Sequence, residues 1–96
     1  MRVRNINSTS DKICKCGNWF DHWRNFSGQA ITYCPVEGCF DKVEVGAHVQ
    51  KDITTDKSWY IIPLCKQHNG KTGESLDIGH VWTLVSANVS LTCGKR

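Results

Sequence analysis

The chain has 96 residues, a formal net charge of +3 and a pI near 8.6. This length is typical of one domain, so we expect a single unit over residues 1–96. The charge permits a polyanionic partner but does not itself predict one, because nucleic-acid-binding domains are commonly more basic, with a pI above about 9. No stretch approaches the length of a transmembrane helix, which predicts a protein without a membrane partner.

The chain contains six cysteines. A domain of this length has a small hydrophobic core, which a disulfide bond or a bound metal ion would help to stabilise. Residues 1–5 run into polar sequence without the apolar run of a secretory signal. This predicts a reduced, cytoplasmic setting, in which clustered cysteines indicate metal ligands. In a secreted protein, a disulfide of Cys93 with Cys14 or Cys16 would be the alternative.

The first predicted element is a short amphipathic helix. Residues 1–12 are polar without a clear period and are interpreted as a loosely held arm. After them, Asn18 is a favourable N-cap, and Trp19, Trp23 and Phe26 follow at i, i+4 and i+7. We expect this aromatic stripe to belong to the core rather than to form a binding platform.

A β-hairpin is predicted in the middle of the chain. Residues 43–49 alternate between apolar and polar or small side chains, which is typical of a half-buried strand. Residues 50–57 are polar and predict a turn or loop. Residues 59–62 predict the returning strand, with Pro63 as its end. A last strand is predicted over residues 81–85.

Two pairs of metal-ligand residues flank this hairpin. They are Cys34 and Cys39, with four residues between them, and Cys65 and His68, with two residues between them. Zinc prefers four tetrahedral thiolate and imidazole ligands, and close pairs of this kind can each supply one edge of the tetrahedron. Each pair is predicted to lie on a short turn, here called a knuckle. The order of first knuckle, hairpin, and second knuckle at the start of a helix is that of a treble clef. We therefore predict an α+β fold, a small zinc-stabilised treble clef with an added N-terminal helix and a C-terminal strand, holding one structural zinc ion.

The remaining thiols have no such spacing. Cys14, Cys16 and Cys93 could form a second site with His22, although a one-residue gap is tight for two ligands of one ion. Free or partly buried thiols are the preferred interpretation. The segment 16–23, with its Cys-Gly-x-Trp-x-x-His-Trp pattern, is similar to one in small bacterial proteins, and that likeness implies no function.

The central part of the chain resembles the HNH endonucleases, a treble-clef family also called His-Me finger nucleases. The resemblance is carried by Cys34-x4-Cys39, by Val-Gly-Ala-His-Val at 45–49, and by Ile-Ile-Pro-Leu-Cys-x2-His-Asn with its cysteine and histidine in the second knuckle. It covers about residues 33–75. It implies that a zinc-bound scaffold supports a hairpin and helix that carry an active site.

The resemblance implies that His48 occupies the position of the general base. The preceding metal-binding position falls on Ala47, which has no ligand atom. The position of the asparagine that orients the base falls at about Tyr60, and the second metal-binding position falls on Asn69. Three of the four active-site positions are unsuitable as they stand, so the resemblance implies a scaffold with a degenerate catalytic centre.

We therefore predict a non-catalytic zinc-binding domain that binds a partner, either nucleic acid or protein. A phosphate-contacting face could be lined by Lys42, Lys51, Lys57, Lys66 and Lys71.

The alternative is a divergent HNH-type DNA endonuclease with His48 as general base. It would need Mg²⁺ or Mn²⁺, with Asn69, Asp52 or Asp56 as improvised ligands, because phosphodiester cleavage requires charge stabilisation that a lone histidine cannot supply. His48 alternates with valines on the predicted strand, so a hydrogen-bonded histidine near the zinc site is an equally good interpretation.

Overall fold

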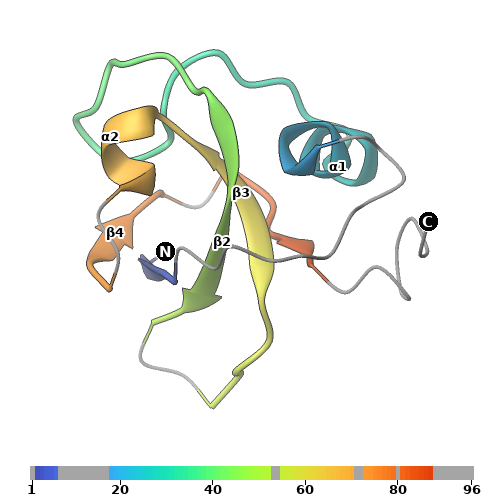
Figure 1. Cartoon of the computed structure of the whole chain (residues 1–96), viewed down its shortest axis with the longest axis vertical. Helices are drawn as coiled ribbons and strands as arrows, with labels where there is room; N and C mark the ends of the chain where they lie inside the picture. Colours follow the sequence, from blue (N-terminus) through green and yellow to red (C-terminus); the bar gives the residue numbers. More distant parts are fainter. Residues whose placement is uncertain (1, 7–17, 53–54, 71–72, 80, 88–96) are drawn as a thin grey trace.

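The computed structural model describes residues 2–6, 18–52, 55–70, 73–79 and 81–87 and shows an antiparallel five-stranded sheet between two helices (Figure 1). Its elements are β1 (Arg2–Asn5), α1 (Trp19–Ser27), β2 (Val45–Lys51), β3 (Tyr60–Leu64), α2 (Lys66–Asn69), β4 (Ser75–Asp77) and β5 (Val85–Ser86). The strand order is β4-β1-β2-β3-β5. The predicted α+β class is therefore confirmed. No helix in the described part of the chain has the length and apolarity that a membrane crossing needs.

The N-terminal strand is the main difference from the sequence prediction. Interpreting residues 1–12 as a loose arm was wrong for Arg2–Asn5, which form β1 between β2 and β4. Val3 and Asn5 are buried while Arg2 and Arg4 are exposed, as the two-residue period of a strand requires. The strand is only four residues long, and alternation over so few residues is a weak signal.

The first helix begins and ends where its caps predict. The Asn18 side chain accepts a hydrogen bond from the Asp21 N–H at 2.8 Å. Gly28 follows with φ 68° and donates its N–H to the Arg24 carbonyl at 3.2 Å. Glycine adopts this left-handed conformation without steric cost, which explains why the helix stops there.

The aromatic stripe of α1 is only partly core. Trp23 is fully buried, and its indole N–H donates to the Thr83 carbonyl at 2.7 Å. His22 is also fully buried, with Nε2 2.8 Å from the Ser86 carbonyl. Phe26, expected in the core, is 46% exposed. The helix therefore has residues 22 and 23 fully buried, whereas Phe26 in its last turn is half exposed.

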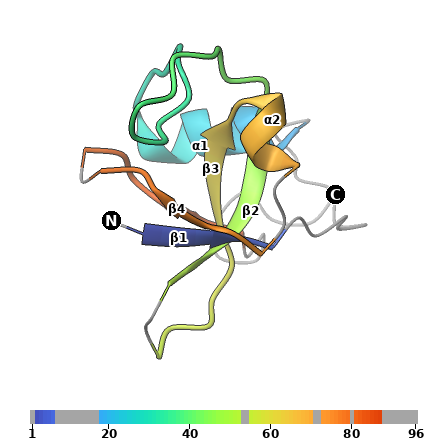
Figure 2. The same cartoon turned by 90° about the vertical axis from the view of Figure 1, so that its left-hand side faces the viewer.

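The hairpin β2–β3 lies within two residues of its predicted position, since β2 covers 45–51 instead of 43–49 and includes the first two residues of the predicted loop. Strand β3 does not end at Pro63. The pairing continues with Pro63 opposite Gly46 and Leu64 opposite Val45. A proline is tolerated there because β5 pairs only with Tyr60 and Ile61, so the missing N–H is not needed for a second ladder. Figure 2 shows that the tip of the hairpin extends away from both helices.

The two ends of the sheet were predicted less well. The last strand was expected over residues 81–85, whereas β5 contains only Val85–Ser86. Strand β4, Ser75–Asp77, was not predicted at all. Both are edge strands of two or three residues, too short to produce a recognisable period.

Register assigns the side chains of the sheet to its two faces, because residues directly opposite each other in a ladder share a face. One face carries most of the buried aliphatic core: Val3, Ala47, Val49, Ile62, Leu64 and Leu76. The opposite face carries Gly46, His48 and Ile61 and is covered by α1. Figure 1 shows α2 on the other side of the hairpin from α1.

Gly46 allows the close approach of α1 to this face. A Cβ atom at this position would lie 2.4 Å from the Trp19 carbonyl carbon and 2.5 Å from the Phe20 nitrogen. Both are backbone atoms, so no rotamer change can relieve the clash. The first turn of α1 therefore rests directly on the backbone of β2.

We expect Gly46→Ala to lower the free energy of unfolding by about 1–3 kcal/mol, because the helix must move away from the strand. Chemical denaturation measures this change. Gly70→Ala is the matched control, since a Cβ there would meet the Gln67 carbonyl at 3.5 Å, an ordinary contact. An equal effect of the two substitutions would contradict the contact between α1 and β2.

Candidate metal centre

Four donor atoms from two distant parts of the chain converge beside α2. The Sγ atoms of Cys34, Cys39 and Cys65 and an imidazole nitrogen of His68 all lie within 4.8 Å of one another. The Nδ1 atom of His68 is 3.5 Å from Cys34 Sγ and 3.2 Å from Cys65 Sγ, and Cys39 Sγ is 3.9 Å from Cys65 Sγ. These residues are the predicted ligands, and they lie close enough to hold a metal ion.

The donor separations agree with a tetrahedral site. Metal–sulfur bonds of about 2.3 Å and metal–nitrogen bonds of about 2.0–2.1 Å give tetrahedral edges of roughly 3.5–3.8 Å. Two of the three separations, 3.5 and 3.9 Å, lie within about 0.1 Å of that range, and the third, 3.2 Å, is slightly short. These three separations are therefore close to those of a zinc-sized tetrahedral site.

The first pair lies on a tight knuckle. Its backbone turns at Gly38, which has φ 79°, and closes with a hydrogen bond from the Cys39 N–H to the Val36 carbonyl at 3.0 Å. The Cys34 N–H donates to the Asp41 carbonyl at 2.7 Å, which joins the two arms of the knuckle. The two thiols are therefore brought to the same side by local backbone geometry.

The second pair lies at the start of α2. Cys65 is the N-cap of this helix, and its Sγ accepts the His68 N–H at 3.4 Å. The Asn69 N–H bonds to the Cys65 carbonyl at 3.0 Å and completes the turn. Residues three apart on a helical turn lie on the same side, which places the imidazole of His68 beside the Cys65 thiol.

The cluster is largely removed from solvent. Cys34 and Cys65 are buried, whereas Cys39 and His68 are half-buried, and the three cysteines are free thiols. Burial raises the pKa of the Cys34 thiol to about 12, because its thiolate would lose hydration. A cation among the four donors would offset this cost, since a coordinating thiol is deprotonated by the metal charge.

Asn5 is a residue of the site that sequence reasoning missed. Its side chain is fully buried, and Nδ2 donates to the carbonyls of His68 at 3.0 Å and Asn69 at 2.7 Å. The alternation of Arg-Val-Arg-Asn could have placed Asn5 on the buried face of a strand. Nothing local indicates that this strand lies against the end of α2.

His48 lies on the face of the sheet that α1 covers. Its ring is 4.8 Å from the Trp19 ring and 6.1 Å from the Trp59 ring, measured between centroids, and the residue is only 6% exposed. Ala47, at the position implied for a metal ligand, faces the opposite side of the strand. The role of His48 as a general base stays a prediction.

The other acidic candidates are engaged elsewhere. Asp52 pairs with Arg4 at 3.0 Å and accepts the Ser75 hydroxyl at 2.6 Å. Asp56 accepts the Tyr60 hydroxyl at the hairpin tip. Among the described residues, the Cys₃His cluster is the single group of three or more Cys, His, Asp or Glu residues close enough to hold a metal ion.

The suggested second site falls mainly outside the described residues. Cys14, Cys16 and Cys93 are not among them, so both that site and the alternative disulfides stay predictions. The fourth proposed ligand, His22, is buried within α1, and its ring contacts those of Trp19 and Phe26 at 4.9 and 5.1 Å between centroids.

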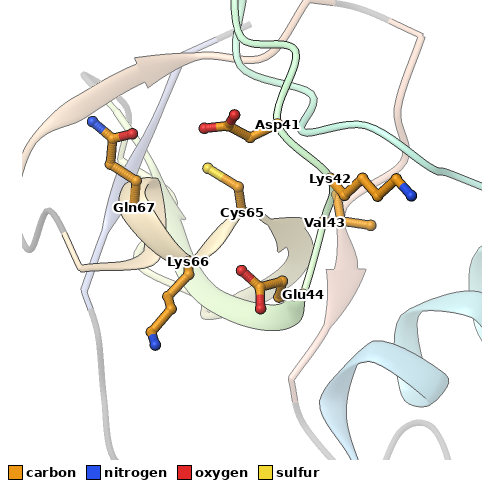
Figure 3. Close-up of a pocket in the computed structure, with 7 residues that line it drawn as sticks. All are labelled: Asp41, Lys42, Val43, Glu44, Cys65, Lys66 and Gln67. Atoms are coloured by element: carbon orange, nitrogen blue, oxygen red, sulfur yellow. The ribbon is translucent and has the colours of Figure 1, made fainter.

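A cavity of about 690 Å³ adjoins the metal cluster (Figure 3). Its walls are residues 41–44, which lead into β2, and the start of α2. The lining side chains are Asp41, Lys42, Val43, Glu44, Cys65, Lys66 and Gln67. Two carboxylates and two ammonium groups balance each other, so this surface has mixed charge.

Comparison of the chain with protein-family models, curated proteins and solved structures finds no match. The function of the site therefore has to be argued from its own geometry and chemistry.

The Asp56–Tyr60 pair gives the hairpin tip a defined pH response. Hydrogen bonds, first from the Tyr60 hydroxyl and then from the Ser58 N–H, lower the pKa of Asp56 to about 2. A carboxyl whose pKa is lower in the folded state stabilises the fold above its unfolded value, near 4, and this contribution is lost as pH falls towards 2.

We expect Tyr60→Phe to raise the pKa of Asp56 towards its ordinary value and to flatten the dependence of stability on pH between about 2 and 4. NMR titration of the Asp56 carboxyl measures the first effect and denaturation across pH the second. Tyr33→Phe, at an exposed tyrosine, is the control. An unchanged Asp56 pKa would assign the shift to the backbone hydrogen bonds instead.

Proposed function

We propose that the chain is a structural zinc-binding domain that contacts a partner through the surface around its metal centre. The convergence of three thiols and one imidazole within 4.8 Å carries this proposal. Zinc is favoured by the donor set, because Cys₃His is a common combination in structural zinc sites. Four protein ligands leave no open position for water or substrate, which supports a structural rather than a catalytic ion.

The arrangement of the two knuckles supports a treble clef. The first knuckle precedes β2, the hairpin follows, and the second knuckle ends β3 and begins α2. Helix α2 is short, with four residues from Lys66 to Asn69. We propose that residues 33–75 form the treble-clef core of a single domain and that the HNH-like spacing reflects this scaffold.

We expect the purified protein to contain one zinc ion per chain and to lose it on Cys65→Ala, because the remaining three donors cannot complete the tetrahedron. Native mass spectrometry with elemental analysis measures both. Cys16→Ala is the control for loss of a thiol and is expected to retain the ion. A wild-type protein without metal would overturn the proposal, and a second ion lost on Cys16→Ala would reveal another site.

The metal end of the hairpin is the best candidate for a partner surface. The cavity beside Cys65 lies there, and the neighbouring Phe40 is 85% exposed. Tyr33, 56% exposed, is bridged to the cavity-lining Lys42, and exposed aromatic side chains beside a concavity can anchor a protein partner. The mixed charge of the cavity lining suits a protein segment better than a run of phosphates.

The lysines predicted for nucleic-acid contact divide between the two ends of the hairpin. Lys42 and Lys66 line the cavity. Lys51 ends β2 at the hairpin tip, 3.7 Å from Asp56, and Lys57 follows in the same turn. A seven-residue strand is roughly 20 Å long, so a nucleic acid would have to extend along the whole hairpin to contact both groups. Lys71 lies outside the described residues.

The nuclease alternative is less favoured by the surroundings of His48. A general base must reach the attacking water, whereas this imidazole is packed beneath Trp19 and is 6% exposed. The carboxylates suggested as metal ligands form hydrogen bonds elsewhere in the described part of the fold. A domain of this spacing can keep the scaffold of a nuclease family without its chemistry.

Binding of duplex DNA, measured across salt concentrations, distinguishes a nucleic-acid partner from a protein partner. With two lysines on the proposed surface, we expect weak binding and a log–log salt slope no steeper than about −2. Lys42→Ala with Lys66→Ala should abolish this slope, whereas Lys51→Ala with Lys57→Ala should not. A steeper slope that survives the first pair would contradict the proposed surface and favour nucleic-acid contact elsewhere on the chain.

A further inference from the structure

We propose that Asn5 is a positioning residue for the metal centre, and that through it metal binding is coupled to closure of the N-terminal strand. The proposal rests on the zinc site described above. Asn5 does not offer a ligand atom to the cluster. Instead, its side-chain amide holds the backbone of the residue that does, so that the His68 imidazole stays within reach of the three thiols.

Asn5 forms four hydrogen bonds to α2 and to the chain that follows it. Nδ2 donates to the carbonyls of His68 and Asn69, at 3.0 and 2.7 Å. The backbone N–H of Asn5 bonds to the Glu74 carbonyl at 3.3 Å, and its carbonyl accepts the Gly73 N–H at 2.6 Å. One buried residue thus contacts both sides of the connection between α2 and β4.

Helix α2 needs such external support. A four-residue helix is far below the length at which helices are stable alone, and its last carbonyls have no helical partners. The Gly70 N–H reaches the carbonyls of Lys66 and Gln67, both at 3.2 Å. Asn5 supplies donors to the carbonyls of His68 and Asn69, so it completes the C-terminal cap from another strand.

His68 is therefore held from two sides. Its imidazole Nδ1 faces Cys34 and Cys65, at 3.5 and 3.2 Å, and its carbonyl is bound by Asn5. Groups that orient a metal ligand without touching the ion commonly change metal affinity by about 10–100-fold when removed. An amide that fixes the backbone of a ligand acts in the same sense.

The same contact links the metal centre to the sheet. Strand β1 lies between β2 and β4 and pairs with both, so its docking completes one half of the sheet. If β1 docking stabilises the metal-binding position of His68, then metal binding stabilises β1 docking by the same factor. The N-terminal strand is then an indirect component of the metal site.

The test compares Asn5→Ala with Val3→Ala in the full chain. Val3 is fully buried on the same strand and the same face, but its side chain has no hydrogen-bond donor. Zinc affinity is measured by competition with a chelator. The geometry of the site is read from the visible absorption bands of the Co²⁺-substituted protein, which report the ligand set of the folded form rather than its stability.

We expect Asn5→Ala to weaken zinc binding at least tenfold beyond Val3→Ala and to shift the Co²⁺ bands, as displacement of His68 would. Val3→Ala should leave the bands unchanged. If Asn5→Ala does not fold, Asn5→Ser, which keeps one donor, should show a smaller shift in the same direction. Suppose instead that the wild-type protein binds one zinc ion, and that the Asn5 variants keep the wild-type Co²⁺ bands and bind zinc as tightly as Val3→Ala does. That result would overturn this inference and leave the proposed function standing. A wild-type protein that binds no zinc would overturn the proposed function and this inference with it.

Discussion

The meeting of four donor side chains beside α2 is the constraint on which the rest of the fold depends. It joins residue 34 to residue 68, and the hairpin β2–β3 lies entirely within the loop closed by this junction. A chain of 96 residues builds a small core, so a metal ion bound at this junction would have a large share in specifying the structure. The donors converge because each pair is preorganised by its own short turn, which leaves only the two turns to be brought together by the hairpin.

The buried polar residues lie at the junctions between elements rather than at random in the core. Asn5 joins β1 to α2, and His22 joins α1 to β5 through the Ser86 carbonyl. In the described part of the chain, no buried side-chain nitrogen or oxygen lacks a hydrogen-bond partner. Because an unsatisfied buried polar group is costly, each of these side chains favours the arrangement of its two elements in which its hydrogen bonds form. They therefore specify which surfaces meet, whereas the apolar residues supply most of the burial.

How much of this could be predicted from the sequence depends on the range of the interactions. The caps of α1, the spacing of the two knuckles and the alternation in β2 are local patterns, and each led to an element at the expected place. Strands β1 and β4 pair residues about seventy positions apart, such as Val3 with Leu76, and their own sequences are too short to show a period. The role of Asn5 follows only from that long-range pairing, so no local signal could have identified it.

The position of His48 shows why a pattern of residue types does not by itself define a catalytic site. The alternation of the strand correctly placed this histidine on β2, but which face it occupies, and what covers that face, depends on α1. Gly46, two residues earlier and on the same face, lets the backbone of Trp19 approach the strand directly. The Trp19 ring then lies against the histidine. The neighbouring glycine and the aromatic helix together cover that face of the strand, which leaves His48 only 6% exposed.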